Sequence, residues 1–194
     1  MSQSILLPML KVIWAVFGIY WLVVARGGKV AEVGERNFYR PVRLTVLVVT
    51  FTLLFFERIA IGFLGRRFVG QLPAISYAGF AVTLAGLAIA VWARIHLGQY
   101  WSDKIVLKVD HRLIRSGPYE YLRHPIYSGV LLGVAGTALV VGEWRAATAF
   151  MLLLTNYWIK AKREEQMLAS RFGEGLRNYQ KQAGFLLPRF RWKT

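Results

Sequence analysis

The chain has 194 residues, of which 56% are hydrophobic, 14% aromatic and 18% charged, and it contains no cysteine. A soluble domain carries about 25% charged and about 45–50% apolar residues, so the composition excludes an ordinary water-soluble enzyme. The lack of cysteine excludes disulfides, thiolate metal sites, iron–sulfur clusters and cysteine nucleophiles. A formal net charge of +15 is the remaining anomaly in so apolar a chain.

Long apolar runs predict an all-α integral membrane protein with about five transmembrane helices. A helix needs about 20 mostly apolar residues to cross about 30 Å of hydrocarbon. We expect three full-length spans and then a helical hairpin with two shorter arms and a tip at 142–145. The five expected spans are 5–25, 44–64, 74–95, 125–141 and 146–159.

Two features of these spans need interpretation. Gly129, Gly133 and Gly136 form a small face on the fourth span, which favours close helix packing over a substrate slot. Glu57 and Arg58 lie inside the second span, where charge suggests function, but the pair can equally mark an early helix end.

The basic residues predict the orientation. Of the 25 Lys and Arg residues, 20 lie in the segments 26–43, 94–123 and 160–194, which share one side of a five-span topology. The positive-inside rule makes that side cytoplasmic and places the N-terminus outside. The sequence therefore predicts a multi-pass protein of the plasma or inner membrane with a cytoplasmic C-terminus. The basic excess indicates topology and contact with anionic membrane lipids, not nucleic-acid binding.

The chain divides into three N-terminal transmembrane helices, 1–95, and a polar-rich core, 96–194. Within the core we expect a loop at 96–124 with a β-like run at 104–109, the hairpin at 125–159, and a C-terminal segment at 160–194. Leu168, Phe172, Leu176 and Tyr179 are spaced by four, four and three residues. That spacing predicts an amphipathic helix over 160–182 that lies against the membrane or against the loop.

Residues with chemical potential gather at the cytoplasmic ends of the hairpin. Arg123 and His124 precede the fourth span, whose first amides suit an anionic group, and Glu164 and Glu165 follow the fifth. A carboxylate there can bind the two hydroxyls of a ribose. The plainer alternatives are an interfacial anchor and a solvated charged helix face. Nucleotide-binding loops rich in glycine are absent, and the three histidines lack the spacing of a metal site, so no metal is predicted.

The ordered motifs from His111 to Gly129, then Glu164-Glu165 and Arg171-Phe172-Gly173, closely resemble the isoprenylcysteine carboxyl methyltransferase family. More distantly they are similar to the phospholipid N-methyltransferases. The resemblance implies a methyltransferase that uses S-adenosyl-L-methionine without a Rossmann fold. The cofactor-binding residues that it implies are His111, Arg112, Leu113, Ile114, Tyr119, His124, Pro125, Ile126, Tyr127, Glu164 and Glu165.

The resemblance also assigns chemistry to three residues. Arg123 and His124 are the expected catalytic residues, and Lys160 stands where family members carry an arginine linked to the substrate carboxylate. Lysine keeps the charge but loses the planar fork of arginine. Tyr119 or Tyr127 could hold the sulfonium of the cofactor through cation–π attraction, or belong to an interfacial aromatic belt.

The expected activity is O-methylation of an isoprenylcysteine-like carboxylate or of another lipidic or small hydrophobic acceptor. The alternative within enzymes is N-methylation of a phospholipid, or methylation of another hydrophobic amine or thiol. An amine would need a base, for which His124 or His111 are candidates. The alternative outside enzymes is a non-catalytic scaffold or transporter subunit, but no paired repeats are visible.

Overall fold

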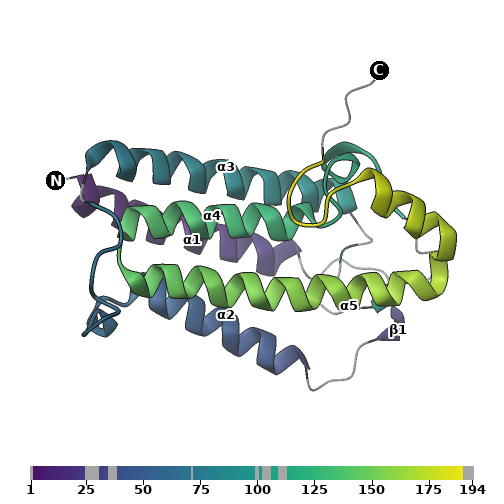
Figure 1. The fold of residues 1–194 in the computed structure, drawn as a ribbon, viewed down its shortest axis with the longest axis horizontal. Coiled ribbons are helices and arrows are strands. Elements are labelled where there is room, and N and C mark those ends of the chain that lie inside the picture. Colours follow the sequence, from purple (N-terminus) through teal and green to yellow (C-terminus); the bar gives the residue numbers. More distant parts are fainter. Residues whose placement is uncertain are drawn as a thin grey trace.

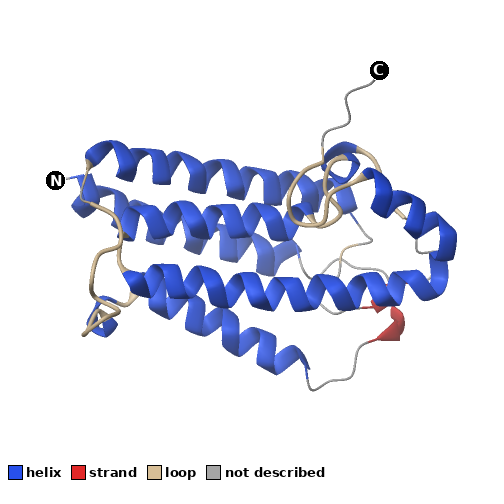
Figure 2. Cartoon of the chain, in the orientation of Figure 1, coloured by secondary structure: helices blue, strands red, loops and turns tan. Residues whose placement is uncertain are grey.

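The computed structural model of the chain describes residues 2–24, 31–34, 39–70, 72–98, 101, 106–108 and 113–189. Within them, five α-helices lie alongside one another, and both short strands gather at the end where α1 finishes and α2 begins (Figure 1; Figure 2). In chain order the elements are α1 (Ser2–Val24), β1 (Ala31–Gly34), α2 (Tyr39–Phe55), η1 (Glu57–Ile59), α3 (Pro73–Leu97), β2 (Val106–Lys108), η3 (Gly117–Glu120), α4 (Pro125–Val141) and α5 (Trp144–Gln182).

The described helices match the five expected spans in number and order, but α2 ends earlier than the second expected span. Two of the described helices, at Ser4–Val24 and Pro73–Leu97, are long and apolar enough to cross a membrane. Pro41–Phe55 and Pro125–Val141 are apolar but shorter. A five-span topology therefore stays a prediction, although α4 begins and ends at the expected residues.

The second expected span, 44–64, is wrong in its last nine residues. The helix α2 ends at Phe55, and Glu57 begins a short 3₁₀ turn, so the charged pair marks an early helix end. The final carbonyl groups of a helix have no amide donor within the helix. Arg145, which is only 2% exposed, supplies one by donating from Nη1 to the carbonyl oxygens of Leu53 at 2.8 Å and Leu54 at 2.9 Å.

The helices α3 and α4 pack closely along the predicted glycine face. A Cβ atom added to Gly129 would lie 2.6 Å from the amide nitrogen of Ala90 and 2.6 Å from the carbonyl oxygen of Gly86. Real Cβ atoms do not approach backbone that closely, so only glycine permits this separation of the two helices. The packing interpretation of the small face is confirmed.

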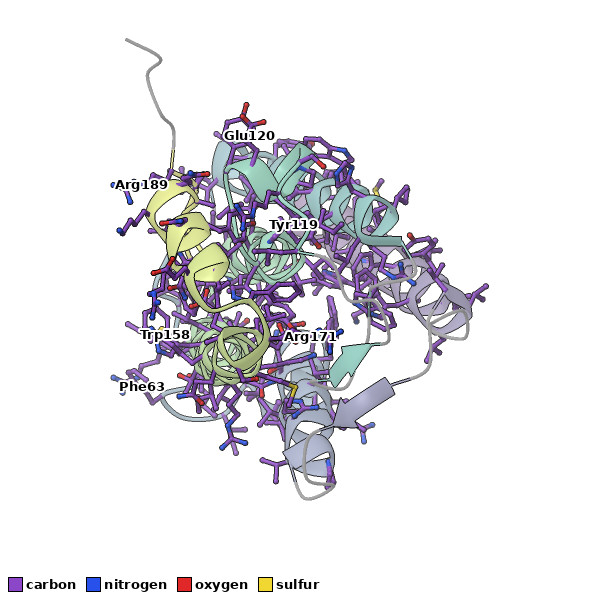
Figure 3. All side chains as sticks on the ribbon, turned by 90° about the vertical axis from the view of Figure 1, so that its right-hand side faces the viewer. Phe63, Tyr119, Glu120, Trp158, Arg171 and Arg189 are labelled. Atoms are coloured by element: carbon purple, nitrogen blue, oxygen red, sulfur yellow. The ribbon has the colours of Figure 1, made fainter. Side chains whose placement is uncertain are left out.

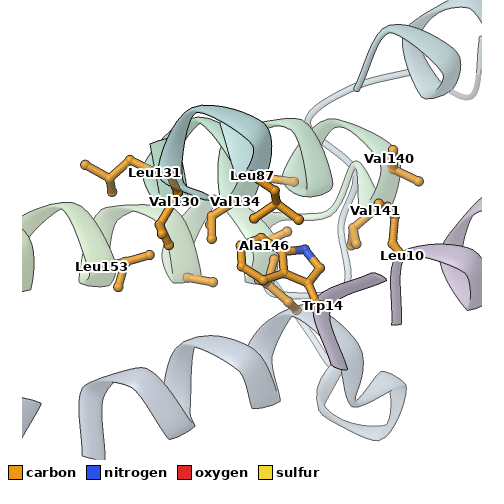
Figure 4. Packing of buried hydrophobic residues seen from close by; sticks show 14 of the residues in the cluster. Leu10, Trp14, Leu87, Val130, Leu131, Val134, Val140, Val141, Ala146 and Leu153 are labelled. Atoms are coloured by element: carbon orange, nitrogen blue, oxygen red, sulfur yellow. The ribbon is translucent and has the colours of Figure 1, made fainter. Parts of the chain in front are cut away.

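The main core joins all five described α-helices, with Trp14 of α1 among its buried residues. Figure 4 shows its indole beside Leu87 of α3 and near Val134 of α4. The indole nitrogen donates a hydrogen bond to the Thr137 hydroxyl at 3.0 Å, which satisfies the one polar group of this buried side chain. The first helix is thereby fixed against the hairpin by packing and by a specific polar contact.

A two-stranded antiparallel sheet links the α1–α2 connection to the loop before α4. Ala31 pairs with Lys108 and Gly34 pairs with Val106. The strand β2 lies inside the expected β-like run at 104–109, whereas the sequence offered no signal for β1. The pairing places the segments 31–34 and 106–108 at the same end of the bundle, as the expected topology requires.

The C-terminal helix reverses its course at Gly173. This residue has φ 46° and ψ −115°, a conformation open to glycine but strained for other residues, and it interrupts α5 between Trp144 and Gln182. The last part of α5 then folds back over the loop (Figure 1). Leu176 and Tyr179 pack there with Leu113 of the loop and with Phe172. The predicted apolar stripe is therefore real, but it bends and closes on the loop instead of forming one straight helix.

Candidate active site

The loop before α4 is bound to the segment that follows α5. Leu122 forms an isolated parallel β-bridge with Gly184, and the backbone amide of Arg123 donates to the Gly184 carbonyl oxygen at 2.8 Å. The amide of Gly184 donates in turn to the Tyr121 carbonyl oxygen at 3.0 Å. We call the last part of α5 and the residues that follow it, from Gly173 to Phe185, the fold-back. The fold-back thus fixes the loop residues that carry the motif.

Glu165 is the centre of a buried polar network. Its carboxylate accepts hydrogen bonds from Arg123 Nε at 2.6 Å, from Gln180 Nε2 at 2.9 Å and from His124 Nε2 at 3.3 Å. Burial disfavours the charged carboxylate, but the hydrogen bonds and charges of His124 and Arg123 outweigh burial and lower the pKa of Glu165 to about 2. Glu165 is therefore ionised and holds together the loop, α5 and the fold-back.

Arg123 is held by several protein groups. Besides Glu165, it donates from Nη1 to the carbonyl oxygens of Gln180 at 3.1 Å and Ala183 at 2.6 Å. Its guanidinium lies over the ring of Phe185, 5.4 Å from the centroid. This arrangement suits a residue that positions the neighbouring His124 and the fold-back.

Glu164 faces a different environment from its neighbour. The Tyr127 hydroxyl donates to Glu164 Oε1 at 2.6 Å, and the second oxygen, Oε2, lies 3.6 Å from His124 Nδ1. The Glu164 side chain is 22% exposed, against 9% for Glu165. Glu164 is therefore the carboxylate of the pair that can reach a ligand, whereas Glu165 is committed to the protein.

Tyr127 lies inside an aromatic stack. Its ring is parallel to the His124 imidazole within 6°, with centroids 5.5 Å apart, and it stacks on Tyr157 at 4.7 Å. The Lys160 ammonium lies 5.2 Å from the Tyr127 ring centroid. The Tyr127 ring therefore contacts two rings and one cation, whereas the buried ring of Tyr119 stacks on His96 with centroids 6.3 Å apart.

Tyr119 points into the molecule from the 3₁₀ turn, and the neighbouring Glu120 points outward (Figure 3). The Tyr119 hydroxyl reaches the Ala93 carbonyl oxygen at 3.4 Å, and its own carbonyl accepts from the Tyr179 hydroxyl at 2.6 Å. Burial raises the pKa of Tyr119 and of Tyr179 above the ordinary tyrosine range. Both hydroxyls therefore remain protonated donors at physiological pH.

The remaining expected cofactor residues separate into three groups. Ile114 and Ile126 pack together with Tyr119 in one apolar cluster, and Pro125 is fully buried at the start of α4. Leu113 packs in the second cluster, with the fold-back. His111 and Arg112 lie outside the residues that the structure describes.

One end of a large apolar cavity lies at Tyr127 and Lys160. It has a volume of about 1050 Å³ and runs along α1 and α2, with α4 and α5 completing its wall. Lys11 and Phe56 line one end, and Tyr127 and Lys160 line the other. Tyr127 therefore belongs both to the cavity wall and to the group around Glu164.

Several residues of this region were missed by sequence reasoning. Tyr157 could have been found, because Tyr157, Lys160 and Glu164 are spaced by three and four and so share one helix face. Gln180 and Phe185 carry no local signal, since they reach the site only through the reversal at Gly173.

Comparison with known proteins identifies the segment that carries these motifs. Residues 79–170 match the model of the isoprenylcysteine carboxyl methyltransferase (ICMT) family. The matched segment covers just under half of the chain. It includes Arg123, His124, Tyr127 and the Glu164–Glu165 pair, but not α1 or α2.

Individual relatives agree with the family match. The chain is 31% identical over 99 residues to a protein-S-isoprenylcysteine O-methyltransferase of Schizosaccharomyces pombe, covering 50% of this chain and 42% of that protein. It is 41% identical over 75 residues to a methanethiol S-methyltransferase of Pseudomonas deceptionensis, covering 38% of this chain and 27% of that protein.

The fold is similar to that of a solved family member. The structure of the eukaryotic intramembrane Ras methyltransferase ICMT aligns with a TM-score of 0.54 at 24% sequence identity, covering 76% of this chain and 52% of that one. The chain thus spans about half of the solved ICMT protein and less than half of both sequence relatives.

Proposed function

We propose that the chain is an integral membrane methyltransferase that transfers the methyl group of S-adenosyl-L-methionine to the carboxylate of an isoprenylcysteine-like or other lipidic acceptor. One observation carries this proposal: Tyr127 and Lys160 line the end of the apolar cavity, and Tyr127 is hydrogen-bonded to Glu164. The family match and the isoprenylcysteine O-methyltransferase relative support the reaction class.

The donor set suits the cofactor. Glu164 offers a partly exposed carboxylate that accepts hydrogen bonds from ribose hydroxyls, and Tyr127 fixes its orientation. Tyr119 offers an aromatic ring for a cation that has no hydrogen-bond donors. The apolar cluster of Ile114 and Ile126 borders Tyr119 and excludes water. When bound, S-adenosyl-L-methionine supplies a methyl group activated by the positive sulfonium.

The protein then has to align the acceptor and exclude water. Holding two reactants in line can supply much of the rate of a displacement, and no covalent nucleophile on the protein is needed. Lys160 is buried at the cavity end, where its ammonium can hold the acceptor carboxylate. A carboxylate arrives ionised, so this reaction requires no base. His124 and Arg123 serve in this scheme by orienting the two glutamates.

The same features support placement in a membrane. The cavity wall includes Leu22, which is 71% exposed, and Val48, which is 66% exposed. Apolar side chains that are exposed on helix surfaces favour contact with lipid. We propose a multi-pass protein of the plasma or inner membrane in which a lipidic acceptor enters sideways between α1 and α2. The cofactor would arrive from the cytoplasm.

One observation favours a second candidate, S-methylation of a small thiol. The methanethiol S-methyltransferase shares 41% identity over its 75 aligned residues. A thiol of that size would leave most of a cavity of about 1050 Å³ empty, so the lipidic carboxylate remains the first candidate. A thiol acceptor would also need a base, for which His124 is placed beside Glu164.

The proposal is tested by calorimetric binding of S-adenosylhomocysteine to the purified protein. We expect binding by the parent protein, at least about tenfold weaker binding by Glu164→Gln, and near-parental binding by the exposed control Glu174→Gln. Absence of binding by the parent protein would remove the enzyme proposal altogether.

A further inference from the structure

The cavity has an uneven distribution of charge. Of the described residues that line it, Lys11, Arg43 and Lys160 are basic, and none is acidic. Lys11 lies at one end, where its ammonium pairs with Glu57 at 3.3 Å. Arg43 is in the first turns of α2, toward the end where Lys160 lies.

The alignment of α2 with α5 places Arg43 and Lys160 at similar positions along the length of the helix bundle. Arg145 of α5 contacts the carbonyl oxygens of Leu53 and Leu54, which aligns the end of α2 with the start of α5. The two helices run in opposite directions (Figure 1). Eleven residues back from Leu54 is Arg43, and eleven residues forward from Arg145 is Asn156. Eleven residues of α-helix span about 16 Å, so Arg43 lies level with Asn156 along the bundle.

Lys160 lies one helical turn beyond Asn156, about 6 Å farther toward the cytoplasmic loops. Arg43, Asn156 and Lys160 all line the same cavity. The end of the cavity nearest Glu164 therefore presents a guanidinium, an amide and an ammonium, whereas the walls between Lys11 and this end are mainly aliphatic and aromatic.

We propose that Arg43 is a specificity-determining residue that, together with Lys160, selects acceptors whose apolar tail ends in a carboxylate. This inference rests on the proposed function and names the substrate class of the same site. A guanidinium forms paired hydrogen bonds with a carboxylate and disfavours an amine of like charge. Because α2 lies outside the segment 79–170, acceptor choice depends on a part of the chain that the family match does not cover.

The charge arrangement also assists release of the product. An acceptor carboxylate oxygen forms the new bond to the methyl carbon while the carbon–sulfur bond breaks, and the sulfur leaves with the bonding electrons as S-adenosylhomocysteine. No proton is taken up or lost. The product ester is neutral, so the attraction of Arg43 and Lys160 for the end group falls in the same step.

The test measures binding and does not depend on turnover. Purified protein in detergent is titrated with three ligands that share one farnesyl tail and end in a carboxylate, an alcohol or an amine. We expect the carboxylate to bind most tightly. Arg43→Gln should weaken carboxylate binding about tenfold and change alcohol binding less than about twofold. Arg43→Lys should retain the preference for the carboxylate.

Two further variants make the result decisive. Arg177→Gln removes a cation whose side chain is 69% exposed, away from the cavity, and should bind all three ligands as the parent does. Asn156→Asp adds a negative charge level with Arg43 and should shift the preference toward the amine. If Arg43→Gln weakens all three ligands equally, Arg43 is structural and the inference fails.

Failure of the inference can be told from failure of the proposed function. S-adenosylhomocysteine affinity reports the cofactor site and should be unchanged in Arg43→Gln. A parent protein that binds no S-adenosylhomocysteine but still prefers the carboxylate contradicts the enzyme proposal alone. A parent that binds S-adenosylhomocysteine and prefers the carboxylate, with that preference unchanged in Arg43→Gln, contradicts the role of Arg43 alone.

Discussion

The two adjacent glutamates of the site have different roles, as their hydrogen bonds show. Glu165 accepts three hydrogen bonds from protein groups, whereas Glu164 accepts one from Tyr127 and its side chain is partly exposed. A motif can mark both residues but cannot say which of them faces a ligand. The difference comes from the fold-back, because Gln180 reaches only Glu165.

The lowered pKa of Glu165 predicts an acid-sensitive contribution to stability. The ordinary carboxyl value is 4.5 and the folded value is about 2, so the stabilisation is complete above about pH 4.5 and is lost as the pH falls toward 2. A shift of this size corresponds to about 3 kcal/mol. Glu165→Gln should lower the free energy of unfolding by about that amount at pH 7, and the difference should vanish near pH 2.

Thermal unfolding in detergent across this pH range measures the effect. Glu174→Gln is the matched control, since the Glu174 side chain is 87% exposed, and it should track the parent protein at every pH. A constant difference between parent and Glu165→Gln from pH 7 to pH 2 would show that ionisation of Glu165 does not stabilise the fold.

The Tyr127 hydroxyl should matter for the cofactor more than for stability. Tyr127→Phe keeps the stacked ring but removes the 2.6 Å hydrogen bond to Glu164. We expect S-adenosylhomocysteine affinity to fall about fivefold to tenfold, with a stability loss of about 1 kcal/mol. Calorimetry and thermal unfolding separate the two effects, and Tyr77→Phe, at a tyrosine 58% exposed on α3, serves as control. Unchanged affinity in Tyr127→Phe would argue against Glu164 as a cofactor residue.

At the scale of elements, the reversal of α5 builds the site. The positive φ of Gly173 lets the chain turn back, and that turn delivers Tyr179, Gln180 and Ala183 to the loop. The apolar periodicity of the sequence continued across Gly173, so it predicted the buried stripe without the bend. Arg123 then finds its carbonyl partners only in the bent arrangement.

Gly173→Ala should therefore damage the site from a distance. A residue with a Cβ atom is strained at φ 46° and ψ −115°, at a cost of about 1–3 kcal/mol. We expect lower stability and weaker S-adenosylhomocysteine binding together, measured by thermal unfolding and calorimetry. Gly175→Ala, two residues farther on and without a positive φ, should leave both near the parental values. Parental behaviour of Gly173→Ala would mean that the fold-back does not hold the site.

Prediction from the sequence succeeded where local pattern decides the structure. Hydropathy and Pro125 defined α4 to the residue, and the expected helical hairpin correctly placed His124 near the two glutamates. Prediction failed where contacts between residues far apart in the sequence determine the structure. The end of α2 depends on Arg145, which is about ninety residues away in the chain, and the strand β1 exists only by pairing with β2.

At the scale of the whole molecule, helices outside the family segment form most of the wall of the apolar cavity. The helices α1 and α2 carry no motif, yet they supply most of the residues that line it. Under the proposed function, the segment 79–170 would provide the methyl-transfer chemistry, and α1 and α2 would act together with Lys160 of α5 in selecting the acceptor.

The charge distribution makes a separate prediction at this scale. The end of the bundle that holds the site also holds β1, β2 and the fold-back, which belong to the three basic segments of the sequence. A reporter fused after Thr194 should therefore be cytoplasmic, and one fused before Met1 should be external. A C-terminal reporter on the external side would overturn the proposed orientation.

The most direct measurement is transfer of a labelled methyl group from S-adenosyl-L-methionine by the purified protein to the farnesyl series of carboxylate, alcohol and amine, extended by a farnesyl thiol. We predict a base-labile methyl ester of the carboxylate ligand, formed in equal amount with S-adenosylhomocysteine, and little label on the other three. Label on the amine or the thiol in preference to the carboxylate, or on none of the four ligands, would contradict it.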